Sequence, residues 1–234
     1  MVSSRTTAII LRRINYGEAD RIITLLTRDF GKIALIAKGV RKEKSKLAGG
    51  IELMSESDIS FIKGKGDIGT LVSTQLSRHF GNIHTDLDRM RVASEFLKRI
   101  DTVTEDETNS DYYDLTIDMF VSLNTPEIPT VLVQAWATMR LMFLMGEVIN
   151  VENDSLDEPF SADSNYRFSY EDNRFIPDMK GDVEPSLIKF LRLLATESPA
   201  RLMAVKNLRE LSERAAALLD LSYKYSRPQV GYKE

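Results

Sequence analysis

Short apolar runs rich in Ile, Leu, Val and Thr recur through the first eighty residues and are separated by turn residues. In the run 32–37, Ile33, Leu35 and Ala37 fall on one face, which is the period of two typical of a half-buried strand. Five such runs without a long helix predict a small antiparallel barrel. The pattern does not separate an open OB-type barrel, which commonly binds oligonucleotides, from an SH3-like barrel. The runs are TAIIL (7–11), RIITLLT (21–27), KIALIA (32–37), DISFIK (58–63) and TLVSTQL (70–76).

From His79 onward the apolar residues follow a helical period instead. Thr85 and Asp88 match the S/T-x-x-D/E capping pattern, so we expect a helix to begin there. Further helices are expected over 110–124, from near Pro126 to about Gly146, and along the stripe of leucines near 208–219. The helix ending near Gly146 is apolar on nearly all sides, which predicts that it is buried at the centre of its domain.

Residues 150–181 interrupt this helical part with a polar, acidic segment. Within it, YRFSY and RFIP alternate like two short strands, which predicts a small β-excursion. The fold class expected is therefore α+β. A five-stranded barrel over residues 1–80 is followed by a mostly helical domain over 81–234, with the excursion at about 150–181.

Charge divides the chain in the same place as the pattern does. Residues 1–80 hold 14 Lys and Arg against 8 Asp and Glu, a net of +6, whereas the remainder holds 17 against 27, a net of -10. The two values sum to the net charge of -4. This asymmetry indicates a polyanionic partner for the first part, the alternative being that the basic residues are merely solvated surface.

The densest positive stretch is AKGVRKEKSK, residues 37–46, in which five basic side chains surround Glu43. We predict that these side chains neutralise the phosphates of DNA, together with two lysines near residue 64 and two arginines of the first strand. The predicted contacts are Arg12, Arg13, Lys38, Arg41, Lys42, Lys44, Lys46, Lys63 and Lys65.

A glycine pattern near the last of these lysines resembles a dinucleotide-binding fingerprint. GKGDIG, residues 64–69, fits G-x-G-x-x-G, but that fingerprint requires a helix after the glycines. Here the strand-like TLVSTQL follows, so a hairpin turn with Lys63 and Lys65 at its tip explains the glycines better. No cofactor is expected.

Nothing in the sequence assembles a convincing active site, so we expect a protein that is not an enzyme. Cysteine is absent, which excludes disulfides and thiolate chemistry and agrees with a cytoplasmic location. His79 and His84 lack an acidic residue at metal-ligand spacing, so no metal is expected. A dispersed nucleophile and base stay open as an alternative. The most apolar stretch, Val131 to Gly146, is too short to span a bilayer.

Residues 6–54 resemble the opening of the bacterial DNA repair protein RecO family. The matching features occur in order: Y-G-E-x-D-R (16–21), T-x-x-x-G-K (27–32), A-K-G-x-R (37–41) and S-K-L-A-G (45–49). Beyond residue 80 the likeness is weaker and rests on LMFLMG (141–146) and YSRP (225–228).

The resemblance implies an N-terminal OB-fold and a recombination mediator found in the cytoplasm with the nucleoid. Such a mediator binds single- and double-stranded DNA, anneals complementary strands and helps RecA displace the single-stranded-DNA-binding protein. Its implied partners are RecR, the acidic tail of the single-stranded-DNA-binding protein and, indirectly, RecA. The alternative from another class is an OB-barrel scaffold or an RNA-binding protein of an unrelated assembly. An acidic, apolar tail needs a basic and apolar pocket, for which Arg140, Lys189 and Arg192 are the candidates.

One departure from the family concerns zinc. Many members carry a four-cysteine zinc module where this chain has residues 150–181, a segment without Cys or His. We therefore predict that the excursion is held without zinc by its apolar residues. These are Phe160, Tyr166, Phe168, Tyr170, Phe175 and Ile176.

Overall fold

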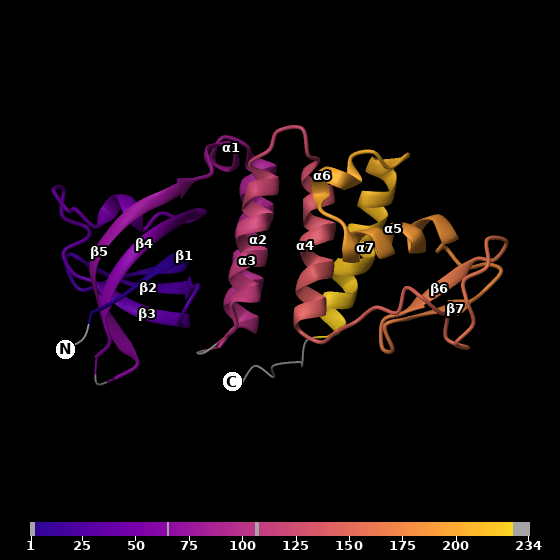
Figure 1. The fold of residues 1–234 in the computed structure, drawn as a ribbon, viewed down its shortest axis with the longest axis horizontal. Coiled ribbons are helices and arrows are strands. Elements are labelled where there is room, and N and C mark those ends of the chain that lie inside the picture. Colours follow the sequence, from indigo (N-terminus) through magenta and orange to yellow (C-terminus); the bar gives the residue numbers. More distant parts are fainter. Residues whose placement is uncertain (1–2, 65, 106–107, 227–234) are drawn as a thin grey trace. The chain divides into compact units, whose positions relative to one another are not determined.

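Five strands close into a barrel in the computed structural model, which describes residues 3–64, 66–105 and 108–226 (Figure 1). The barrel order is β1-β2-β3-β5-β4, and β4 pairs back onto β1. The strands are β1 (Ser3–Tyr16), β2 (Asp20–Thr27), β3 (Gly31–Ala37), β4 (Ser55–Ile62) and β5 (Ile68–His79). The five predicted strands are confirmed, and they form a barrel of the OB type.

The barrel was expected to be antiparallel throughout, but one pair of neighbouring strands is parallel. β3 and β5 run parallel, with Ala34 opposite Ile68 and Ile36 opposite Thr70. The long connection from β3 to β4 is the cause, because it lets β4 pair with β1 before β5 returns beside β3. Parallel neighbours need such a crossover, whereas a tight hairpin joins antiparallel ones.

The barrel interior is filled by alternate residues of every strand. Ile10, Ile23 and Leu35 are buried in one cluster with Phe61 and Leu71. This is the period of two seen in the sequence, and each large apolar side chain removed from water contributes roughly 1.5–3 kcal/mol. The inward-facing residues therefore fix the strand register.

Three helices follow the barrel: α1 (Gly81–His84), α2 (Leu87–Val103) and α3 (Ser110–Leu123). The helix expected over 110–124 is confirmed. The sequence predicted Thr85 as the N-cap of α2, but the N-cap is the next residue, Asp86. Its carboxylate accepts from the backbone N–H groups of Asp88 (2.9 Å) and Arg89 (3.1 Å). Thr85 instead ends α1, and its hydroxyl donates to the carbonyl of Asn82 (3.3 Å).

The helices α2 and α3 pack against the outside of β1 and β2. Ile9 and Leu26 are paired neighbours on these strands and are fully buried, although they lie outside the interior cluster. The Tyr113 hydroxyl on α3 donates to the Glu56 carboxylate of β4 (2.6 Å). Burial, reinforced by this bond, raises the pKa of Tyr113 above its ordinary value of 10.0, so the hydroxyl remains a donor.

The chain divides into two compact units, Met1–Thr125 and Pro126–Glu234. The predicted domain boundary at residue 80 marks the end of the barrel strands, but α1 to α3 belong to the first unit with the barrel. The reason is the second buried face of β1 and β2, which only a packed helix layer keeps from water.

The second unit is centred on α4 (Thr130–Leu144), with α5 (Pro185–Thr196), α6 (Pro199–Leu202) and α7 (Leu208–Tyr225). The prediction of a central buried helix is confirmed, since Leu132, Trp136 and Leu141 of α4 are buried with most of their neighbours. The side-chain amide of Gln134 on α4 donates a hydrogen bond to the Asp220 carboxylate of α7 (2.8 Å). No helix was predicted over 185–196, where α5 lies.

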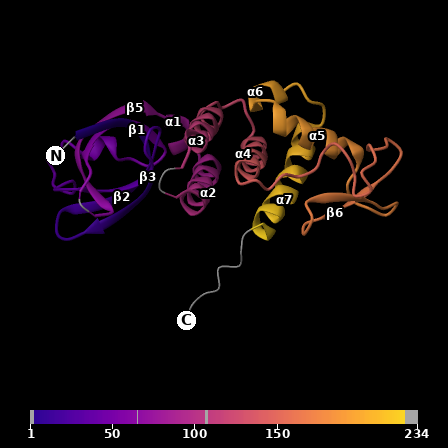
Figure 2. The same ribbon diagram turned by 60° about the horizontal axis from the view of Figure 1, so that its bottom comes forward.

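A two-stranded excursion interrupts the second unit, as predicted (Figure 2). It consists of β6 (Tyr166–Ser169) and β7 (Arg174–Pro177). Tyr166 and Phe175 are almost completely buried, and Phe160 packs edge-on against both, with centroid distances of 5.1 and 5.7 Å. Tyr170 stacks on Tyr225 at the end of α7 (5.3 Å). The aromatic side chains thus form the core of the excursion.

Candidate nucleic-acid interface

Residues 38–46, here called the basic loop, connect β3 to a 3-10 turn at Ala48–Gly50. All five of the basic side chains of this loop are exposed. Among the residues that the structure describes, none of them forms an ion pair with a carboxylate, so their charge is left for a ligand. They are Lys38, Arg41, Lys42, Lys44 and Lys46.

The start of the basic loop is anchored to the β1–β2 hairpin. The Asp20 carboxylate accepts from the backbone N–H of Gly39 (2.7 Å), and the backbone N–H of Arg41 donates to the carbonyl of Ala19 (2.9 Å). The Arg41 guanidinium donates to the carbonyl of Gly17 (3.4 Å). Gly39 has φ +64°, a left-handed conformation that glycine adopts without strain. The Y-G-E-x-D-R and A-K-G-x-R motifs therefore meet in space, one anchoring the other.

The end of the basic loop is fixed against the barrel. Leu47, directly after the loop, packs against the barrel core, and Ile51 is buried within it. A side chain at Gly50 would place its Cβ 2.0 Å from the Thr74 hydroxyl, which donates to the Gly50 carbonyl (2.8 Å). Anchored at both ends, the loop holds its exposed charges at one end of the barrel.

Arg12 and Arg13 form ion pairs within the first unit, unlike the five cations of the basic loop. Arg13 donates to the carbonyl of Ile51 (3.1 Å) and pairs with Glu52 (3.0 Å), which fixes the segment after the basic loop. Arg12 pairs with Asp101 of α2 (3.5 Å). The two arginines therefore serve internal contacts, on different sides of β1.

Lys63 and Lys65 were predicted to reinforce the basic loop. Lys63 is exposed at the end of β4, but it lies near the start of β3, whereas the basic loop follows the end of β3. Lys63 thus belongs to a different cluster, which lines a pocket that contains no residue of the basic loop. Lys65 lies outside the described residues.

The sequence reasoning passed over Tyr16, the first residue of the Y-G-E motif. Its side chain is 54% exposed, and it directly precedes Gly17, to which the basic loop is anchored. Exposed aromatic rings together with basic side chains are the composition of single-strand binding surfaces, on which bases stack. An aromatic residue directly before a turn glycine is the signal that could have identified it.

In the second unit, the three predicted partner contacts separate into two groups. Lys189 and Arg192 line a cavity of about 390 Å3 with the apolar residues Pro159, Phe160 and Ile188. Lys189 is exposed, while Arg192 donates to the carbonyl of Val151 and pairs with Glu152 (3.3 Å).

Arg140 does not line this cavity. Its guanidinium donates to the carbonyl of Ala195, and the neighbouring indole of Trp136 donates to the carbonyl of Glu197 (2.9 Å). Both side chains satisfy carbonyls at the C-terminal end of α5. Arg140 therefore joins α4 to α5 rather than lining the cavity with Lys189 and Arg192.

No cluster of three or more metal-ligating side chains occurs in the part of the chain that the structure describes. Two carboxylates of the excursion are engaged in hydrogen bonds and an ion pair within it. Asp154 is buried and accepts from the backbone N–H groups of Leu156 (2.8 Å) and Glu158 (3.2 Å), while Asp157 pairs with Arg174 (3.2 Å). Also within the described ranges, no helix is long and apolar enough to cross a membrane.

Removal of divalent metals is expected to leave the melting temperature of the protein unchanged. The excursion contains neither Cys nor His, and its aromatic core supplies the packing that zinc would otherwise provide. Thermal unfolding followed with and without EDTA tests this. Stoichiometric zinc in the purified protein, measured by elemental analysis, would contradict it.

Comparison with known proteins agrees with the motifs. Residues 1–80 match the family described as "Recombination protein O N terminal". The chain is 34% identical over 142 residues to the "DNA repair protein RecO" of Heliobacterium modesticaldum, covering 61% of this chain and 51% of that protein. Proteins of the same name match from Acetivibrio thermocellus (33% over 144 residues, 61% and 57%) and Listeria welshimeri (30% over 139 residues, 59% and 54%). The match thus spans little more than half the length of these relatives, and it confirms the RecO resemblance.

Proposed function

We propose that this chain, whose residues 1–80 match the RecO N-terminal family, is a recombination mediator in DNA repair. It binds single- and double-stranded DNA, anneals complementary strands and assists the loading of RecA. RecR and the single-stranded-DNA-binding protein are its direct protein partners, and it acts at the nucleoid in the cytoplasm without catalysing a reaction.

The observation that carries this proposal is the basic loop. Five exposed cations, which form no ion pair within the described part of the chain, stand on a loop anchored at both ends to an OB-type barrel. Lysine and arginine contacts to phosphate position a protein on nucleic acid without reading its sequence. Such contacts suit a protein that must act on any damaged region and on both single strands and duplexes.

The partner contact proposed for the second unit is the cavity lined by Lys189 and Arg192. Its Phe160 and Ile188 surfaces are apolar, and the Lys189 ammonium is exposed at its edge. A peptide that is both acidic and apolar matches this combination, which is the composition of the tail of the single-stranded-DNA-binding protein. The acidic remainder of the chain repels phosphate and leaves DNA to the basic loop.

A comparison of DNA with RNA separates this function from an RNA-binding scaffold. Fluorescence anisotropy with oligonucleotides of one sequence, as single-stranded DNA, duplex DNA and single-stranded RNA, measures the three affinities at one salt concentration. A mediator is expected to bind both DNA forms at physiological salt. Binding confined to RNA, or no binding to any of the three, would contradict the proposal.

A further inference from the structure

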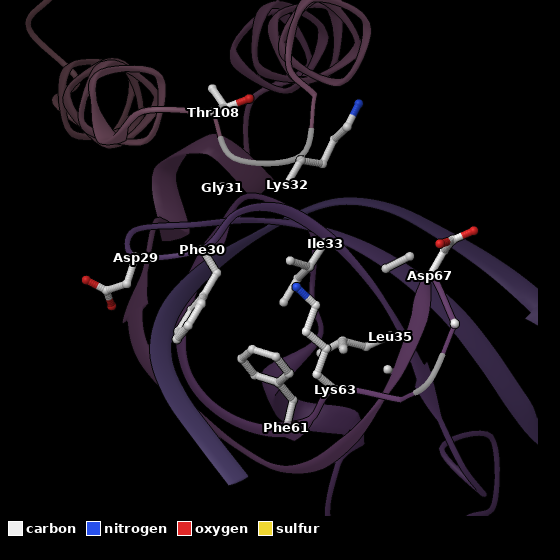
Figure 3. Close-up of a pocket in the computed structure, with 13 residues that line it drawn as sticks. Asp29, Phe30, Gly31, Lys32, Ile33, Leu35, Phe61, Lys63, Asp67 and Thr108 are labelled. Carbon is white, nitrogen blue, oxygen red and sulfur yellow. The ribbon is translucent and has the colours of Figure 1, made fainter. Parts of the chain in front are cut away.

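The open end of the barrel contains a cavity of about 710 Å3 that is lined by no residue of the basic loop (Figure 3). Its apolar lining comes from Phe30, Ile33, Leu35 and Phe61, and Lys63 lies at its rim. The charged residues Asp29, Lys32 and Asp67 also line it, so the cavity offers both apolar and polar contacts, and its size is that of pockets that bind small ligands.

Phe30 presents an aromatic surface to this cavity. The ring is 41% exposed and packs edge-on against the buried Phe61, with centroids 5.4 Å apart and planes at 88°. The Thr27 hydroxyl fixes the turn, since it donates to the Gly31 carbonyl (2.8 Å) and accepts from the backbone N–H of Phe30 (3.0 Å). The ring is thus held in place before any ligand arrives.

Lys63 supplies the charge of the cavity. Figure 3 shows its side chain extending over the opening with the ammonium toward Ile33. Lys63 has no ion pair among the described residues, whereas Lys32 is engaged by Asp101, donating to its carbonyl (2.8 Å) and pairing with its carboxylate (3.7 Å). A cation without an ion pair among the described residues, lining the same cavity as an exposed aromatic ring, fits a ligand that carries both a planar group and an anion.

We propose that one unstacked base of a DNA single strand enters this cavity and stacks on Phe30, with an adjoining phosphate beside Lys63. This inference rests on the proposed DNA-binding function. A duplex keeps its bases stacked in pairs, so the site favours single strands, whereas the basic loop contacts the backbone of either form. One base brings a single phosphate, which Lys63 can neutralise, whereas an acidic peptide would bring several carboxylates beside Asp29 and Asp67, which also line the cavity.

The test couples a change in the protein to a change in the DNA. Phe30→Leu keeps an apolar side chain but removes the aromatic face, and Phe30→Tyr restores that face. Anisotropy is measured for each with an intact single strand, with the same strand carrying abasic sites, and with a duplex. Thermal unfolding verifies that each variant is folded.

Phe30→Leu is expected to weaken binding of the intact single strand by about 5- to 100-fold, the range of one base stacked on an aromatic ring. It is expected to leave the abasic strand and the duplex unaffected, and Phe30→Tyr is expected to bind like the wild type. An equal loss for intact and abasic strands, or no loss at all, would overturn the proposal.

Two further outcomes are distinct. If the wild-type protein binds no DNA, the proposed function and this site fail together. If it binds DNA and Phe30→Leu changes nothing, only this site fails. Tight binding of an acidic peptide that Phe30→Leu abolishes, with DNA binding unchanged, would overturn the base site and reassign the cavity to a protein partner.

Discussion

Reversing Arg41, Lys42 and Lys44 to glutamate is expected to weaken DNA binding at least roughly 50-fold at 0.15 M salt. Each phosphate contact contributes about 0.7 to 0.9 to the slope of log affinity against log salt, so three lost contacts flatten the slope by about 2 to 3. The loss applies to every sequence alike, because phosphates carry no sequence information. Anisotropy titrations over a range of salt concentrations measure both quantities.

A matched control separates the site from net charge. Lys180, Lys206 and Lys224 are exposed lysines of the second unit, and their reversal changes the formal charge by the same amount. This control is expected to keep wild-type affinity and slope to within a few-fold. Wild-type affinity in the basic-loop variant, or an equal loss in the control, would show that the basic loop is not the binding site.

Truncating Phe175 to alanine is expected to destabilise the second unit by about 3–5 kcal/mol, the usual cost of removing a buried aromatic ring. Phe175 is fully buried and packs against Phe160 (5.7 Å) and Phe168 (4.8 Å). Trp136, the single tryptophan of the chain, lies in the same unit, so its fluorescence during urea unfolding reports this loss directly.

Two other truncations test whether burial sets the cost. Phe168 is half-buried, so Phe168→Ala is expected to cost less than Phe175→Ala. Met179 is 96% exposed, and Met179→Ala is expected to have no measurable effect. A cost for Phe168→Ala that equals or exceeds that of Phe175→Ala would contradict the packing described for the excursion.

The strands and most helices could be predicted because their apolar residues follow simple periods. The parallel seam between β3 and β5 could not, since it depends on the route of residues 38–54 rather than on any local pattern. The sequence does contain an indication that helices cover the outside of the barrel. Ala8 to Leu11 are four consecutive apolar residues, and all four are buried, as expected of a strand covered on both faces.

The candidate site was predictable in composition but not in arrangement. The five cations of the basic loop could be identified from charge density, and the structure leaves them exposed. The ion pairs of Arg12 and Arg13 and the bond of Arg140 to α5 depend on residues 39 to 89 positions away. Sequence proximity therefore grouped charges that the fold separates. Phe30 was overlooked because a single aromatic residue in a turn carries no periodic signal.

The central claim is that the basic loop makes this chain a mediator of DNA strand pairing. Its most direct test is the annealing of complementary oligonucleotides that are coated with single-stranded-DNA-binding protein, followed by the fluorescence of dyes on the two strands. The wild-type protein is expected to accelerate annealing. The variant with Arg41, Lys42 and Lys44 reversed is expected to lose that acceleration, and the control with Lys180, Lys206 and Lys224 reversed is expected to keep it. No acceleration by the wild-type protein, or equal acceleration by the basic-loop variant, would contradict the account.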